Sequence, residues 1–189
     1  MSTIGHNRGP ALEPGQSWRK HCWTRARAEL LPKTMPIEIV RMRVKRAAEL
    51  GLDYTTYASL RAASGHDVVA FLFSSNALRL LPPRPALPGD RAEKLGAMRD
   101  CLRIALAQAP LQVQAALAAA APAIDAAHRA PDALASWGTA RQALRAALDP
   151  AKLPGDRVIL VGDMALEREW CAAAGLAGYL PAERYFATA

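Results

Sequence analysis

Residues 37–80 carry apolar side chains at intervals of three and four, the spacing of one face of an α-helix. This pattern predicts a helix that starts after Pro36 and stops at Gly51. It also predicts a second helix over residues 54–63, with Asp53 as its N-terminal cap. Arginine and lysine lie mostly off the apolar stripe of the first helix. We therefore expect two short helices, the first of them strongly basic, joined by a glycine turn.

The next segment, residues 68–80, fits two structures. Ser64 and Asp67 have the spacing of a helix-capping signal, and apolar residues recur at helical intervals as far as Leu80. Its first part, residues 68–73, is a short apolar run that also suits a buried strand. The sequence favours a third helix. A strand paired with residues 158–161 would instead remove that helix and favour functions other than DNA binding.

Residues 91–148 are rich in alanine, and their apolar spacing predicts three further helices. A capping box of Asp90 and Glu93 starts the first of these helices. The clearest strand of the chain is residues 158–161, followed by a helix over residues 164–174. The predicted fold class is mainly α, with an N-terminal basic unit of three helices and an alanine-rich helical region with one isolated short strand. The three helices of the alanine-rich region are predicted over residues 91–106, 111–129 and 131–148, the second of them kinked or restarted at Pro122.

Proline and charge divide the chain at the same place. Residues 82–90 contain four prolines and predict a stiff linker. Residues 1–84 carry 13 Lys/Arg and 6 Asp/Glu, whereas residues 85–189 carry 11 of each, so the whole net charge of +7 lies in the first part. This excess favours an anionic partner, with nucleic acid ahead of a membrane surface or an acidic protein. The predicted parts are a mobile arm (1–16), a basic helical domain (17–81) that begins with a helix over 17–31, the linker (82–90) and an alanine-rich helical domain (91–189).

Composition argues against several classes of protein. Three widely spaced cysteines without a Cys-x-x-Cys pair argue against a disulfide framework and a structural zinc site, so we expect no metal and no cofactor. No apolar run approaches the roughly 18 residues of a membrane-spanning helix. The N-terminus lacks the apolar core of a secretory signal. These features predict a cytoplasmic protein without a membrane partner.

Residues 43–62 resemble the helix-turn-helix motif of bacterial DNA-binding proteins. In that motif a small residue four positions before a turn glycine lets two helices cross closely, and the glycine adopts the left-handed conformation. Arg46 departs from the motif, which has an apolar residue there, and Tyr57 is bulkier than usual. The residues that match are Ala47, Leu50, Gly51, Leu52, Tyr57 and Leu60.

The resemblance implies that the exposed side of the second helix contacts DNA. Hydroxyl side chains there suit base edges or phosphates, and the flanking basic residues suit phosphates. The alternative is an ordinary helical core with solvated arginines. The predicted nucleic-acid-binding residues are Arg41, Arg43, Lys45, Arg46, Tyr54, Thr55, Thr56, Ser59 and Arg61.

Residues 158–175 look like the final motif of haloacid-dehalogenase-like hydrolases, with a strand ending in Gly-Asp, a helix and then Ala-Ala-Gly. The resemblance implies that Asp163 holds magnesium. That family also needs a strand ending in Asp-x-Asp, which this chain lacks; the segment 68–80 offers Ser74, Ser75 and Asn76 instead. Without the carboxylate nucleophile phosphoryl transfer fails, and a helix-capping role is the simpler interpretation of Asp163.

These patterns lead to one expected function and two alternatives. We expect a DNA-binding regulator whose alanine-rich part supplies packing, a homodimer contact or partner contacts. The first alternative is a protein-interaction, adaptor or toxin-like module without DNA binding. The second is a degenerate haloacid-dehalogenase-like hydrolase. An enzyme is the less favoured class, because the sequence has no phosphate loop, Gly-x-Ser-x-Gly or comparable catalytic motif.

Overall fold

A computed structural model describes residues 35–187 of the chain. The predicted arm (1–16) and the predicted helix over residues 17–31 lie outside the described residues. The chain divides into two units, Met1–Val40 and Arg41–Ala189. The helix α2 (Ile37–Glu49) begins in the first unit, and every other described helix and strand belongs to the second.

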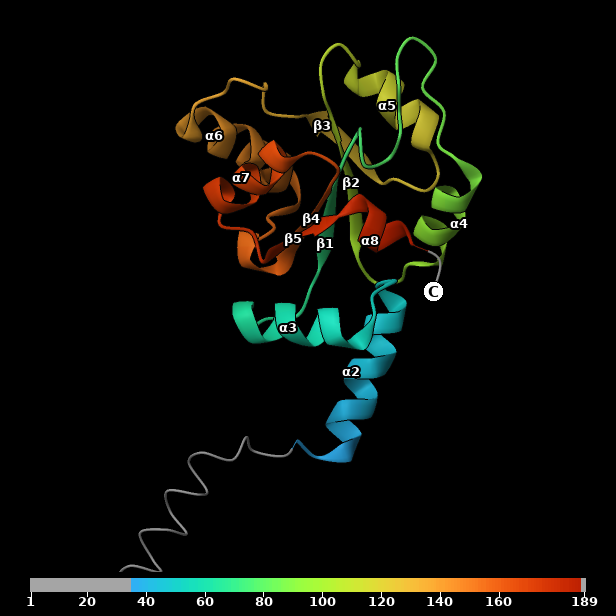
Figure 1. Ribbon diagram of the computed structural model, residues 1–189, viewed down its shortest axis with the longest axis vertical. Helices are drawn as coiled ribbons and strands as arrows, with labels where there is room; N and C mark the ends of the chain where they lie inside the picture. Colours follow the sequence, from blue (N-terminus) through green and yellow to red (C-terminus); the bar gives the residue numbers. More distant parts are fainter. Residues whose placement is uncertain (1–34, 188–189) are drawn as a thin grey trace, which may run out of the picture. The chain divides into compact units, whose positions relative to one another are not determined.

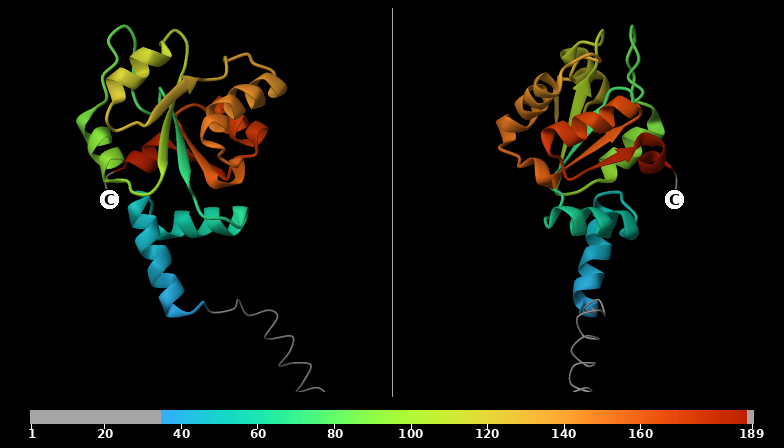
Figure 2. Two further views of the ribbon diagram at one scale, coloured as in Figure 1. Left: turned by 180° about the vertical axis from the view of Figure 1, so that it is seen from behind. Right: turned by 60° about the vertical axis from the view of Figure 1, so that its left-hand side comes forward.

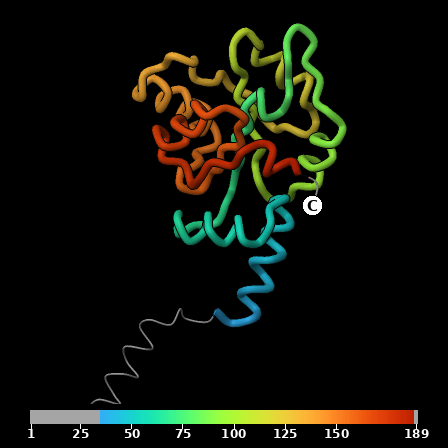
Figure 3. Tube along the Cα trace, viewed as in Figure 1, coloured from blue at the N-terminus to red at the C-terminus, as the bar shows by residue number. Residues whose placement is uncertain are grey.

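The second unit is built on a five-stranded parallel sheet with the strand order β3-β2-β1-β4-β5 (Figure 1). The chain passes from each strand to the next through a connection that contains a helix (Figure 3). The strands are β1 (Ala70–Ser74), β2 (Leu102–Ala107), β3 (Ala126–Arg129), β4 (Val158–Gly162) and β5 (Gly178–Pro181). The helices are α3 (Tyr54–Ser64), α4 (Gly89–Ala97), α5 (Val113–Ala120), α6 (Trp137–Leu148), α7 (Ala165–Ala174) and α8 (Ala182–Phe186), with 3-10 turns at Asp149–Ala151 and Gly155–Arg157.

The prediction of a mainly α fold is wrong, because the protein is an α/β protein with a parallel sheet. The predicted strand exists as β4, but it is not isolated: Val158 pairs with Ala70 and Val161 with Phe73 of β1. On its other side β1 pairs with β2, where Ala70 lies opposite Leu102. All five residues of β1 are buried. A strand buried on both faces is a continuous apolar run, which lacks the period-two alternation that separates a strand from a helix.

Helices cover both faces of the sheet (Figure 2). Side chains alternate along each strand, so Phe71 and Phe73 of β1 point to one face while Ala70 and Leu72 point to the other. The helices α4, α5 and α8 pack on the first face and α6 and α7 on the second, while α3 crosses the amino ends of the strands (Figure 1). This is the doubly wound arrangement of open α/β sheets. It places one apolar core on each face of β1 and β4.

The predicted pair of helices at the start of the described chain is confirmed. Gly51 adopts a φ of 67° in the turn after α2, which favours glycine because a side chain there would be strained. Asp53 caps α3 by accepting the N–H of Thr56 at 2.9 Å, and Gly65 ends α3 with a φ of 75°. The predicted third helix is wrong, since β1 occupies that segment. The Pro-rich stretch 82–90 lies between β1 and β2, two paired strands of the sheet, and its last two residues begin α4.

Two helices predicted in the alanine-rich region each split into a helix and a strand. Instead of one helix over residues 91–106, α4 stops at Ala97 and β2 starts at Leu102. Instead of one helix over residues 111–129, α5 stops at Ala120 and β3 follows. The predicted capping box of Asp90 is also wrong, because the N-cap of α4 is Pro88 and makes no side-chain hydrogen bond.

The last predicted helices are present in shorter form. The helix expected over residues 131–148 starts only at Trp137, after Ser136 caps it. The helix expected over residues 164–174 is α7, and Gly175 ends it with a φ of 64° as predicted.

Candidate functional site

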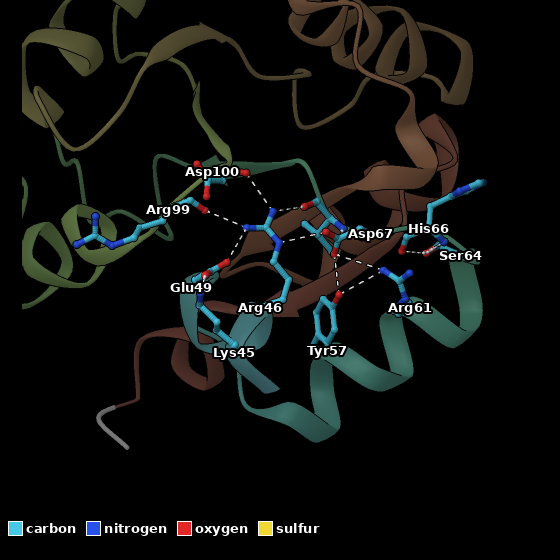
Figure 4. A network of polar contacts seen from close by, with 11 residues as sticks. Lys45, Arg46, Glu49, Tyr57, Arg61, Ser64, His66, Asp67, Arg99 and Asp100 are labelled. Atoms are coloured by element: carbon cyan, nitrogen blue, oxygen red, sulfur yellow. Dashed lines mark hydrogen bonds and ion pairs between the residues drawn. The ribbon is translucent and has the colours of Figure 1, made fainter. Parts of the chain in front are cut away.

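Arg46, predicted to contact phosphate, is the centre of an internal network of polar contacts (Figure 4). Its Nε lies 3.1 Å from Asp67 Oδ2, and only 17% of its side chain is exposed. Five hydrogen bonds use every N–H that a guanidinium carries. Arg46 therefore ties α2 to the segments that precede β1 and β2, and it has no donor left for DNA. The acceptors are the carboxylates of Glu49 and Asp67 and the backbone carbonyls of Val68, Arg99 and Asp100.

Asp67 also binds two residues of α3. The Tyr57 hydroxyl donates to Asp67 Oδ1 at 2.7 Å, and Arg61 Nη1 lies 3.6 Å from the same oxygen. Burial by itself raises the pKa of Asp67, but the bond from Tyr57 and the charge of Arg46 outweigh it and leave that pKa lowered. Arg61, another predicted phosphate ligand, is thus already paired with a carboxylate of its own chain.

The predicted hydroxyl contacts are also engaged within the protein. Thr56 is buried; its Oγ1 donates to Asp53 Oδ2 at 2.5 Å and accepts from Arg184 Nη2 at 2.5 Å. Ser59 Oγ donates to the backbone carbonyl of Thr56 at 2.8 Å. The bond from Arg184 ties Thr56 to the C-terminal helix, whereas the bond of Ser59 lies within α3 and leaves that side chain exposed.

The other five predicted residues keep accessible side chains. Arg41, Lys45 and Thr55 are exposed, and Arg43 and Tyr54 are half-buried. Residues 1–34 carry six Lys/Arg and two Asp/Glu, so four of the seven net positive charges lie outside the described residues. The structure therefore places the predicted nucleic-acid residues in two groups, one built into the fold and one available to a partner.

The parallel sheet brings a different set of residues together. β1 and β4 are neighbours, and the chain continues from them in opposite directions across the sheet, toward β2 and toward β5. In open α/β sheets ligands bind at the carboxyl ends of the strands, at the point where the strand order reverses. Here the carboxyl ends supply the run Ser74, Ser75 and Asn76 at the end of β1, Gln108 after β2 and Asp163 after β4.

Glu167 lies at this edge, in the first turn of α7, and has no exposed surface. Its Oε2 accepts the backbone N–H groups of Asp163 at 2.6 Å and Met164 at 3.1 Å, and its Oε1 accepts Gln108 Nε2 at 2.5 Å. These donors and the positive end of the α7 dipole offset the cost of burying the charge. Gly162 leaves the space for this carboxylate, because a Cβ there would overlap Glu167 Oε2.

The buried carboxylate orients two side-chain amides. A carboxylate only accepts, so Gln108 presents its NH₂ group to Glu167 and its Oε1 to Asn76 Nδ2, at 2.5 Å. Asn76 Nδ2 also lies 2.8 Å from Met164 Sδ. No donor within residues 35–187 is paired with Asn76 Oδ1. That oxygen and the exposed carboxylate of Asp163 are therefore the acceptors that this edge offers to a ligand.

A hollow of about 260 Å³ opens beside the same edge. Gln108, Asp132 and Met164 line it together with the apolar side chains of Leu166 and Trp170. Ligand sites commonly have a few polar groups in an apolar lining and volumes of roughly 300–1,000 Å³. This hollow is slightly smaller and suits part of a small ligand, such as a single ring.

A larger hollow of about 430 Å³ adjoins the turn between α2 and α3 and is lined by Asp53, Lys94 and Arg184. Lys94 Nζ donates to the backbone carbonyl of Tyr185, and Arg184 donates to Thr56 Oγ1. Burial lowers the pKa of Lys94. Both cations of this hollow already have partners within the chain, so it is the weaker candidate for a binding site.

The carboxyl edge does not carry the groups for phosphoryl transfer. Ser74 stands where the hydrolase resemblance needs a carboxylate, and its buried Oγ accepts the N–H of Ala77 at 3.0 Å. Ser75 is also buried, and its Oγ accepts the N–H of Gln108 at 3.1 Å. Within residues 35–187 no group of three or more His, Cys, Asp or Glu is placed to hold a metal ion. The residues present therefore do not fit the magnesium ion that the resemblance implies.

Neither Gln108 nor Glu167 is identified as a site residue from the sequence. Glu167 does have a local signal, because a glutamate three positions after the N-cap is half of a capping box. The N-cap is Met164 rather than serine or threonine, which hides that signal. Gln108 is recognisable only once residues 102–107 are known to be a strand. The spacing of apolar residues there predicts a helix instead.

Comparison of the chain with known protein families, with curated proteins and with solved structures gives no match. In the part of the chain that the structure describes, no helix combines the length and the apolar character needed to cross a bilayer.

Proposed function

We propose that this chain is an α/β domain that binds a small ligand at the carboxyl edge of β1, β2 and β4 and does not transfer phosphoryl groups. The observation that carries this proposal is the fully buried Glu167, bound to Gln108 at 2.5 Å. Burying a carboxylate costs stability unless it is compensated. This one fixes two amides at the point where α/β sheets bind ligands. The proposal keeps the site that the degenerate hydrolase-like alternative implies but assigns ligand binding, and no hydrolysis, to it.

The orientation of the amides supports a ligand that donates hydrogen bonds. Asn76 Oδ1 and the Asp163 carboxylate would accept from hydroxyl or amino groups. The hollow beside Trp170 and Leu166 would take an apolar ring or ring face. A sugar or a nucleoside combines these two properties, whereas a purely apolar compound would leave the acceptors without partners.

The test is ligand binding observed by NMR on the full chain labelled with [methyl-¹³C]methionine. Pentoses, hexoses and nucleosides serve as probes. Met164 lines the hollow and contacts Asn76, so its methyl resonance should shift on binding. Met98 contacts the Tyr185 hydroxyl and serves as the internal reference, because it does not line the hollow.

The control variant is Gln142→Ala, which removes an exposed amide from α6. Asn76→Ala should weaken binding roughly tenfold or more, since a buried hydrogen bond to a ligand is worth about 1–2 kcal/mol. Gln142→Ala should leave the affinity unchanged. The proposal fails if no probe moves the Met164 resonance at millimolar concentrations, or if Asn76→Ala binds as tightly as the wild type.

DNA binding by α2 and α3 remains a second candidate, favoured by the geometry of their turn. Gly51 has the left-handed φ of 67° that the helix-turn-helix resemblance implies. Ala47, the small residue of the motif, is 1% exposed. Lys45, with 80% of its side chain exposed, and Arg41 would contact phosphates.

Gel-shift titration at two salt concentrations tests this second candidate. Replacing Arg41 and Lys45 together by alanine should weaken binding and flatten the plot of log affinity against log salt by about 0.9 for each phosphate that the variant no longer neutralises. The matched control replaces Arg141 and Arg145, two exposed arginines on α6. Equally weakened binding in both double variants would indicate non-specific attraction, and no binding at about 50 mM salt would exclude this candidate.

A further inference from the structure

Arg91 is buried without the partners that a buried arginine needs. Its side chain lies in the first turn of α4, and the residue is 5% exposed. Its Nε and Nη1 are buried and have no hydrogen-bond partner in the described part of the chain. No other buried side-chain nitrogen or oxygen there lacks a partner. Unpaired buried polar groups are rare in folded proteins, and each one calls for a cause such as a ligand.

The groups around Arg91 leave its buried nitrogens without an acceptor. Its Cζ lies 4.5 Å from the centre of the Phe186 ring, which covers one face of the guanidinium. Burial lowers the pKa of Arg91, and the like charge of Arg79 lowers it further. Asp90 and Asp163 act in the opposite direction, but neither accepts a hydrogen bond from Nε or Nη1. The buried guanidinium is therefore left without an acceptor, which favours an anion at this position.

The topology places Arg91 at the edge that carries the candidate site. β1 and β2 are parallel, so α4 between them must run back from the carboxyl edge toward the amino edge. Its first turn, with Arg91, is therefore the end nearer the carboxyl edge. The ring contacts agree: Phe186, under Arg91, lies 6.2 Å from Phe73, which directly precedes the strand end at Ser74.

We propose that Arg91 forms an anion subsite at the carboxyl edge, which holds a phosphate or carboxylate group of the bound ligand. This inference rests on the proposed function and names the chemistry of its ligand. The ligand would then carry hydroxyl or amino groups toward Asn76 and Asp163 and a negative group toward Arg91. Burial makes the arginine effective, because a charge-assisted hydrogen bond gains strength where water is excluded.

The experiment follows the Arg91 Nε–H resonance of the full chain, assigned with Arg91→Met, during titration with inorganic phosphate and separately with acetate. Binding should shift this resonance in one or both titrations. Arg91→Met keeps the volume and the contact with Phe186 but removes the donors, so calorimetric titration of this variant should show binding weakened at least tenfold. The control is Arg141→Met on the exposed face of α6, which should bind like the wild type.

The two titrations separate the two anions. A response to phosphate alone supports a phosphorylated ligand, and a response to acetate supports a carboxylate. A silent Arg91 resonance in both titrations overturns the subsite, as does equal binding by Arg91→Met. If sugars or nucleosides still shift the Met164 methyl in that case, the proposed ligand site at the carboxyl edge stands without the anion subsite. If phosphate shifts the Arg91 resonance while those probes leave the Met164 resonance unchanged, the anion subsite stands and the proposed sugar or nucleoside binding fails.

Discussion

Arg46 Nε lies 3.1 Å from Asp67 Oδ2, a contact that joins α2 to the segment entering the central strand β1. The two residues are 21 positions apart in the chain. Arg46 thus acts as a bridge between the helical pair and the sheet. A basic residue that looks available for a phosphate can be fully used by its own fold.

Arg46→Ala should lower the free energy of unfolding by about 2–3 kcal/mol, because it leaves Asp67 Oδ2 and several backbone carbonyls without a donor. Lys45→Ala, one position away, should change it by less than about 0.5 kcal/mol, since Lys45 forms only an exposed pair with Glu49 at 3.8 Å. Urea denaturation measures both. Equal, small effects would contradict the bridging role of Arg46.

Acid should destabilise the protein through three aspartates whose pKa values are lowered in the folded state. Burial raises the pKa of Asp67 and Asp125, but bonds from Tyr57 and Arg46 and from Arg103 outweigh it. At Asp53 the bond from Thr56 lowers the pKa. A lowered folded-state pKa gives stability that is present above the ordinary value of 3.8 and is lost as pH falls through the folded-state pKa.

The measurement is the urea midpoint of wild type and Asp67→Asn between about pH 7 and about pH 2.5. At neutral pH Asp67→Asn should be the less stable protein. The difference should shrink as the pH falls below about 4, because the wild-type carboxylate then takes up its proton. A difference that stays constant with pH would show that the charge of Asp67 contributes nothing.

Gly162→Ala should lower the free energy of unfolding by about 1–3 kcal/mol, the usual cost of overpacking. The new methyl group would overlap Glu167 Oε2 and come within 2.7 Å of Tyr179 Cε2. Gly96→Ala is the matched control, because a Cβ at this position of α4 meets nothing within 4 Å. It should stabilise the protein by about 0.5–1 kcal/mol through helix propensity. Thermal unfolding of both variants would reveal whether Gly162 is needed to seat Glu167.

The chain should show no magnesium-dependent hydrolysis of p-nitrophenyl phosphate. Ser74 and Ser75 are buried acceptors of backbone N–H groups, and no carboxylate nucleophile stands at the end of β1. The rate with wild type should equal the rate with Asp163→Asn. Turnover that requires both magnesium and Asp163 would restore the hydrolase alternative.

The sequence alone determined the elements that depend on neighbours along the chain. Gly51, Gly65 and Gly175 end helices with positive φ values, and Asp53 caps α3. The strand β4 was also visible, because Val158–Gly162 is a compact β-branched and apolar run between turn residues.

Only the tertiary structure decided which apolar runs are strands and which polar groups form a site. β1 and β2 become strands because each is paired on both sides, and β1 is buried throughout while β2 is buried from Ile104 to Ala107. Pairing and burial depend on distant segments and leave no alternating pattern in the sequence. Gln108 meets Glu167 across 59 positions, and Arg46 meets Asp67 across 21. Such contacts depend on the order of strands in the sheet, so neither the buried carboxylate nor the bridging arginine could be identified before the fold.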